Sequence, residues 1–108
     1  MDMETTVMEL ILHAGEARSC SMQALRAARS YDWQEADAQL TAASVAAKAA
    51  HKIQTALIGA DEGVGLVPVN LILVHAQDHL MNAMLCRELA EEIIGLHREL
   101  QALKQAQA

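Results

Sequence analysis

The sequence predicts an all-α protein, an antiparallel three-helix bundle, from its composition, its apolar periodicity and its turn signals. The 108-residue chain is 53% hydrophobic and rich in Ala and Leu but holds one Pro and five Gly, a composition that favours helix. Small and apolar residues recur at alternating spacings of three and four in three long segments. Turn-forming residues at 30–32 and 59–70 separate these segments. We therefore expect one domain spanning residues 1–108.

The first helix is predicted over about residues 5–30, with a stripe of mostly small side chains along one face. The stripe consists of Leu10, Ala14, Ala17, Ser21, Ala24 and Ala28. Gly15 interrupts the pattern, and we expect close packing against a neighbouring helix there. A turn follows at residues 30–32, where Asp32 and Glu35 form a pattern like a capping box for the next helix.

The second helix is predicted over about residues 33–58, and Gly59 is expected to end it. Its seam consists of Ala36, Leu40, Ala43, Ala47, Ala50, Gln54 and Leu57. Residues 59–70, GADEGVGLVPVN, contain three glycines and Pro68 and form the predicted long loop. The third helix is predicted directly after it, over about residues 71–104.

Charge and composition exclude several classes of partner. The formal net charge is -6 and the eight Lys and Arg residues are scattered, which argues against nucleic-acid binding. No apolar run approaches the ~20 residues that span a bilayer, and the acidic start of the chain does not resemble a signal peptide. We expect no membrane insertion and a cytoplasmic location. Cys20 and Cys86 lack a CxxC spacing and are expected to be buried, reduced thiols.

The polar residues that interrupt the apolar pattern of the third helix are the candidates for a functional site. One stripe is apolar towards its C-terminal end but continues into His79 and His75, which lie one turn apart on the same helix face. A second stripe of apolar residues is interrupted by Asp78. An ionised Asp is costly to bury without a partner, so a proton, a cation, a donor or solvent must compensate it.

Three interpretations of His75 and His79 remain open from the residues alone. In the first, one imidazole is a nucleophile for a phosphoryl group and the other donates to the phosphoryl oxygens. In the second, the two form a metal pair, although a closed zinc site needs four ligands and the HExxH glutamate is replaced by Ala76. In the third, they are ordinary polar residues, which is our interpretation of His13, His51 and His97.

The segment VHAQDHLM at 74–81 resembles the active-site segment of enzyme IIA of the lactose/cellobiose class (also lactose/chitobiose) in the bacterial sugar phosphotransferase system. AGEARS at 14–19 and YDWQEADAQL at 31–40 resemble its first helix and the turn into its second. AHKIQTALI at 50–58 and LCRELAEEIIGLH at 85–97 resemble the ends of its second and third helices. The resemblance covers about residues 5–100 with matching order and spacing.

The resemblance implies a phosphocarrier that assembles as a homotrimer with a nine-helix core. Members accept a phosphoryl group from HPr and donate it to a cysteine of a cognate IIB protein, which phosphorylates a disaccharide entering through IIC. It implies that His75 is phosphorylated on Nε2 and that His79 supports the phosphoryl group. It further implies that Asp78 lies at the trimer axis, where three copies share Mg²⁺ or another divalent cation. Gln77 completes the motif as a supporting residue.

Some features depart from the family pattern without touching the HxxDH motif. The loop before the third helix is more apolar, Asn70 stands where Ser is common, and aromatic and C-terminal basic residues are fewer. These departures leave the sugar and the choice of partners open. An alternative of the same fold is a regulatory or interaction protein that is phosphorylated as a signal and has no transport role.

Overall fold

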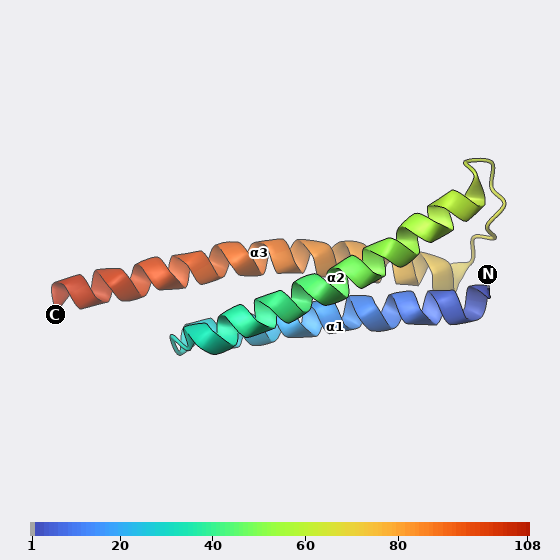
Figure 1. Ribbon diagram of the computed structural model, residues 1–108. Helices are drawn as coiled ribbons and strands as arrows, with labels where there is room; N and C mark the ends of the chain where they lie inside the picture. The colour runs from blue at the N-terminus through green and yellow to red at the C-terminus, as the bar shows by residue number, and fades with distance from the viewer. Residues whose placement is uncertain (1) are drawn as a thin grey trace.

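The computed structural model describes residues 2–108 and consists of three α-helices, which confirms the predicted fold class. α1 spans Met3–Arg29, α2 spans Trp33–Asp61 and α3 spans Leu71–Gln107. α1 and α3 run in the same direction and α2 runs opposite to both (Figure 1). The molecule is elongated, measuring 62 × 20 × 19 Å along its principal axes. Within the described residues, no helix is both long enough and apolar enough to cross a membrane.

The small-residue stripe of α1 forms the centre of the bundle. Its predicted residues are all buried and Val7 extends the row, so this face was identified correctly from the sequence. Ser21 is fully buried among them, and its hydroxyl donates to the carbonyl oxygen of Ala17 at 2.8 Å. α1 packs extensively against both other helices, whereas α2 and α3 contact each other far less. Figure 1 shows α2 and α3 diverging towards the loop that joins them.

The predicted end of α2 at Gly59 is wrong, because the helix continues to Asp61. Its C-cap is Glu62, which has a left-handed backbone (φ 55°), and Gly63 and Gly65 also take positive φ. Asp61 organises this turn. Its carboxylate accepts from the backbone N–H groups of Gly65 (3.3 Å) and Val67 (3.0 Å). The glycines that allow the chain to reverse are therefore those after the helix, while Gly59 is an ordinary helical residue.

The predicted starts of the second and third helices are confirmed, and each carries a capping hydrogen bond, whereas α1 begins two residues before its predicted start and has no side-chain cap. The Asp32 side chain accepts from the backbone N–H of Glu35 at 3.2 Å, and α2 begins at Trp33, the residue after Asp32. The Asn70 side chain accepts from the backbone N–H of Leu73 at 3.0 Å at the start of α3. Such caps satisfy backbone donors that have no partner inside the helix.

α3 is apolar on two opposite faces, and only one of them packs inside the chain. Its buried residues Leu73, Ala76, Leu80, Ala83, Ala90 and Ile94 face α1 and α2. Eight apolar residues on the other side are 41–84% exposed, and we call them the outer stripe: Leu71, Val74, Met81, Leu85, Leu89, Leu96, Leu100 and Leu103. Monomeric proteins rarely expose a contiguous apolar surface of this extent. The outer stripe is therefore an apolar surface that no other part of residues 2–108 covers.

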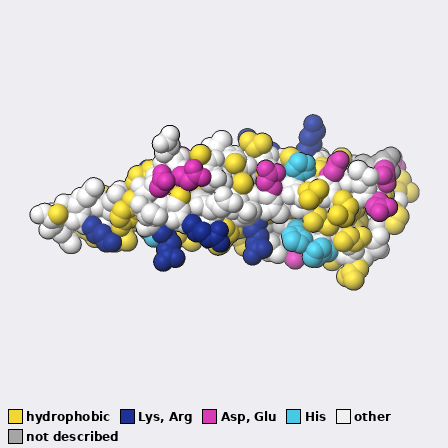
Figure 2. All heavy atoms as spheres, turned by 90° about the horizontal axis from the view of Figure 1, so that it is seen from below, with side chains coloured by type: hydrophobic (Ala, Val, Ile, Leu, Met, Phe, Trp, Pro, Cys, Tyr) yellow, Lys and Arg dark blue, Asp and Glu magenta, His cyan; other side chains and the backbone are white. Residues whose placement is uncertain are grey.

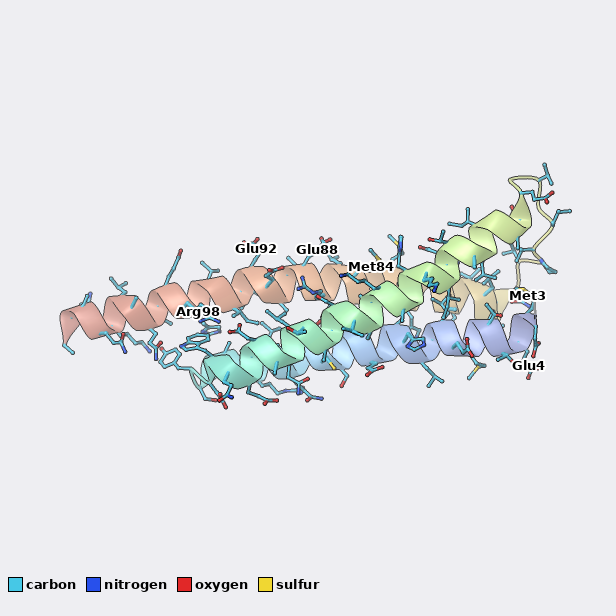
Figure 3. The ribbon with its side chains drawn as sticks, viewed as in Figure 1. Met3, Glu4, Met84, Glu88, Glu92 and Arg98 are labelled. Carbon is cyan, nitrogen blue, oxygen red and sulfur yellow. The ribbon has the colours of Figure 1, made fainter. Side chains whose placement is uncertain are left out.

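A cluster that we call the turn clasp, Tyr31, Trp33, Arg98, Gln101 and Lys104, fastens the α1–α2 turn to α3 where α3 extends past it. The Trp33 indole N–H donates to Gln101 Oε1 at 2.9 Å, and the Arg98 guanidinium lies 4.4 Å from the centre of the Trp33 ring. Lys104 donates to the Tyr31 hydroxyl at 3.0 Å. Figure 3 shows Arg98 on α3 directed towards the start of α2. These contacts accompany the continuation of α3 three residues beyond its predicted end.

We expect Trp33→Ala to lower the free energy of unfolding by about 2 kcal/mol, since the ring is half-buried and full removal of a core aromatic costs about 3–5 kcal/mol. Trp33→Phe keeps most of the packing, loses the hydrogen bond to Gln101, and should cost about 1 kcal/mol. Urea unfolding followed by circular dichroism measures both. Equal stability of Trp33→Ala and the wild type would contradict a fastening role for the turn clasp.

We expect Asp61→Ala to release the loop, because its carboxylate is the acceptor for two loop N–H groups. Amide hydrogen exchange at Gly65 and Val67 should become faster, and the free energy of unfolding should fall by about 1–2 kcal/mol. Glu62→Gly is the matched control, because it removes the neighbouring carboxylate while relieving a left-handed backbone. Unchanged exchange at Gly65 and Val67 in Asp61→Ala would show that these hydrogen bonds do not hold the loop.

Candidate functional site

His75 and His79 form the one histidine pair that the described residues bring into contact. Their Nε2 atoms lie 3.0 Å apart, and the rings meet edge-on with centroids 4.4 Å apart. One Nε2 must carry a proton and donate while the other accepts. When the shared proton is on Nε2 of His79, Nε2 of His75 is unprotonated and its lone pair can act as a nucleophile. The helical spacing predicted this pairing, and the structure confirms it.

The pair lies at the surface, with His75 exposed and His79 half-buried. Figure 2 shows two adjoining histidine side chains on this face. Hydrophobic side chains lie on one side of them, and Lys and Arg side chains lie on the other side. Val74 and Ile72 beside His75 are about half exposed, at 52% and 45%. An exposed imidazole with apolar neighbours is accessible to a group carried on another protein.

A groove lies between His79 and α1. It has a volume of about 340 Å³ and is lined by Gly15, Arg18, Ser19, Met22 and Arg26 of α1 together with His79. The sequence alone does not indicate that these α1 residues belong to the site. Their spacing puts them on one helix face, but only the side-by-side placement of α1 and α3 brings that face to His79.

Gln77 and Asp78 lie away from the two imidazoles. The half-buried Gln77 points towards α2, and its side-chain oxygen accepts a hydrogen bond from the Gln54 amide. Gln77 also borders a hollow of about 220 Å³ under the 62–70 loop. It therefore connects α3 to α2. Asp78 is exposed among the residues of the outer stripe, so within one chain solvent compensates its charge.

The metal interpretation of the histidine pair lacks further ligands. Residues 2–108 contain no group of three His, Cys, Asp or Glu side chains placed to share a metal ion. For the divalent cation implied by the resemblance, the Asp78 carboxylate is a suitable oxygen donor for Mg²⁺. One chain offers that ion a single carboxylate, so the fit requires carboxylates from other copies.

None of the remaining candidates is among the residues that line the groove at His79. His51 lies in a hollow between α2 and α3 with Lys48, Lys52 and Met84. Cys20 and Cys86 are free thiols, as predicted, but both are only half-buried. Burial and, to a smaller degree, the Glu16 carboxylate raise the pKa of the Cys20 thiol, which makes it a poor nucleophile near neutral pH.

Comparison with known proteins identifies the class to which this fold and histidine pair belong. The sequence profile described as "PTS system, Lactose/Cellobiose specific IIA subunit" matches residues 5–98. The N,N'-diacetylchitobiose-specific EIIA component of Escherichia coli K12 is 46% identical over 101 residues, covering 94% of this chain and 87% of that protein. The chain is thus a sugar-specific IIA component of the phosphotransferase system.

Two solved structures show the same architecture. The cellobiose-specific enzyme IIA from Bacillus anthracis superposes with a TM-score of 0.90 at 40% identity, covering 94% of each chain. The IIA protein in the Escherichia coli IIA(chitobiose)–HPr complex superposes with a TM-score of 0.81 at 44% identity, covering 94% of this chain and 98% of that one. The chain belongs to the lactose/cellobiose-specific IIA family, as its sequence motifs predicted.

Proposed function

We propose that the chain accepts a phosphoryl group from phosphorylated HPr on Nε2 of His75 and donates it to the cysteine of a cognate IIB protein. The observation that carries this proposal is the exposed His75 ring, whose Nε2 lies 3.0 Å from Nε2 of His79. The solved complex of a 44% identical IIA protein with HPr supports HPr as the donor. The proposed location is the cytoplasm, and the proposed cargo is a disaccharide of the lactose, cellobiose or chitobiose type.

The transfer from HPr to His75 needs no additional base to remove a proton. The Nε2 lone pair of neutral His75, with its proton on Nδ1, attacks phosphorus as the phosphorus–nitrogen bond of the donor phosphohistidine breaks. The donor ring keeps that electron pair and, being protonated on its other nitrogen, leaves as neutral imidazole. His75 becomes the cationic phosphorylated ring. The His79 Nε2–H that donated to the free His75 then donates to a phosphoryl oxygen.

The second transfer reverses these bonds. A cysteine thiolate of IIB attacks phosphorus, a sulfur–phosphorus bond forms, and the phosphorus–nitrogen bond to His75 breaks. His75 keeps the electron pair and returns to neutral imidazole with its proton on Nδ1. The carrier never touches the sugar, so sugar specificity belongs to IIB and IIC.

We further propose that two more copies of this chain cover the outer stripe, giving the homotrimer that the family resemblance implies. The stripe supports this assembly because its exposed leucines recur with the spacing of a coiled-coil seam along α3. Asp78 lies within that stripe, so a symmetric assembly would bring its three copies together. Converging carboxylates repel one another, and a shared Mg²⁺ or similar cation relieves the repulsion.

We expect His75→Gln to abolish labelling when the protein is incubated with phosphoenolpyruvate, enzyme I and HPr, because the accepting nitrogen is lost. His79→Ala should still be labelled, about tenfold to a hundredfold more slowly, because it loses a donor to the phosphoryl oxygens. The label should be acid-labile and base-stable, as phosphohistidine is. Undiminished labelling of His75→Gln would contradict the proposal, and failure of any IIB protein to accept the label would favour the regulatory alternative.

We expect the wild-type protein to sediment as a trimer whose stability depends on a divalent cation. Asp78→Leu should stabilise the assembly and remove this dependence, because replacing three close carboxylates by apolar groups removes the repulsion. Glu9→Leu, an exposed carboxylate on α1, is the control and should keep the cation dependence. Sedimentation of the wild-type protein as a monomer would contradict the proposed assembly.

A further inference from the structure

The phosphoryl group proposed on His75 requires more compensation than His79 provides. A protein-bound phosphoryl group carries about 1.5 to 2 negative charges near neutral pH and has three acceptor oxygens. The neutral His79 ring contributes one N–H. In the whole chain the acidic residues outnumber Lys and Arg, with a net charge of -6, so positive charge at the site has to come from individual basic side chains nearby. The phosphorylated His75 ring carries one positive charge of its own, which leaves about 0.5 to 1 negative charge on the phosphoryl group uncompensated. A second cation beside the phosphoryl oxygens would neutralise that remainder.

The groove between α1 and α3 contains such a cation. Arg18 lines it together with His79, and Gly15, Ser19 and Met22 come from the same face of α1. The two ion pairs formed within residues 2–108 involve Arg87 and Arg98, so the Arg18 guanidinium is not neutralised by either. Ser19 is exposed and its hydroxyl oxygen accepts from the Gln23 amide at 3.3 Å, which leaves the hydroxyl proton free to donate.

The direction of the helices places Arg18 at the His75 end of the groove. α1 and α3 run in the same direction, so moving from His79 back to His75 corresponds to moving along α1 from Arg26 towards Gly15. Helical side chains lean towards the N-terminus of their helix, which inclines Arg18 towards Gly15. Gly15 is exposed, and a Cβ built there would meet no neighbouring atom within 4 Å, so the expected close packing of a helix at this position is wrong. Space is therefore open for the guanidinium and for an anion beside it.

Arg26 lines the same groove but is less suited to this task. It lies eight residues further along α1, about 12 Å of helix away from Arg18 and in the direction opposite to His75. Lys48 and Lys52 border a separate hollow between α2 and α3. Of the two Arg residues that line the groove, Arg18 is thus the nearer one to His75 along the helix direction.

We propose that Arg18, assisted by the Ser19 hydroxyl, binds the oxygens of the phosphoryl group on His75, so that the groove between α1 and α3 is a phosphoryl-binding subsite. This proposal rests on the proposed function of His75. The guanidinium forms charge-assisted hydrogen bonds to two phosphoryl oxygens while His79 donates to the third. The subsite stabilises the phosphorylated carrier and also the charge that develops on those oxygens during transfer.

The test compares Arg18→Gln, Arg18→Lys and the wild-type protein, with Arg29→Gln as the matched control. Arg29 is exposed on α1 but is not among the residues that line the groove, so its variant has the same change in charge. Each protein is labelled in two ways, with phosphorylated HPr and with phosphoramidate, a small phosphoryl donor that has no docking surface. The phosphorylated proteins are then titrated by ³¹P NMR.

We expect Arg18→Gln to be labelled about tenfold more slowly by both donors, as loss of a charge-assisted hydrogen bond predicts. The pKa of its phosphoryl group should rise, because removing a neighbouring cation disfavours the dianion. Arg18→Lys should lie between Arg18→Gln and the wild type, and Arg29→Gln should match the wild type. Normal phosphoramidate labelling and an unchanged phosphoryl titration in Arg18→Gln would overturn the proposal.

Slowed labelling of Arg18→Gln by HPr alone, with a normal phosphoryl titration, would also overturn it and would assign Arg18 to partner docking. These outcomes differ from failure of the proposed function, in which the wild-type protein carries no label on His75. Circular dichroism of each variant checks its helix content, so a loss of helix is not mistaken for loss of the subsite.

Discussion

The close approach of α1 to both other helices is the contact on which the rest of this fold depends. A row of Ala residues with one buried Ser lets the helix backbones come near to each other, because there is little side chain between them. The buried Ser21 adds no unsatisfied polar group, since its hydroxyl bonds to the carbonyl one turn earlier. Since α2 and α3 contact each other so little, α1 fixes how each of them is oriented.

This arrangement leaves α3 free to serve two purposes. One face is committed to the bundle through Leu73, Leu80 and Ile94, and the opposite face stays apolar and exposed. His75 and His79 project between these two faces, so their positions are set by a helix that is anchored on one side only. The proposed chemistry thus depends on a rigid helix whose exposed side is available to other proteins.

Helical periodicity predicted those parts of the structure that one helix determines by itself. The buried stripe of α1, the Asp32 cap and the His75–His79 pair all follow from spacings within a single segment. The end of α2 was missed because Gly59 is compatible with both helix and turn, and the hydrogen bonds made by Asp61 decide between them. The direction of Gln77 and the nearness of Arg18 to His79 depend on how helices pack, which no single-helix pattern contains.

The turn clasp has a consequence for observing this protein in solution. Trp33 is the only tryptophan of the chain, and it stacks with the only tyrosine, Tyr31, with ring centroids 5.8 Å apart. Both rings lie at the α1–α2 turn, well away from the end where α3 begins (Figure 1). Intrinsic fluorescence therefore reports whether the C-terminal part of α3 is docked. The same signal is insensitive to the protonation and chemistry of the distant imidazoles, which makes it an internal optical reference for the folded state.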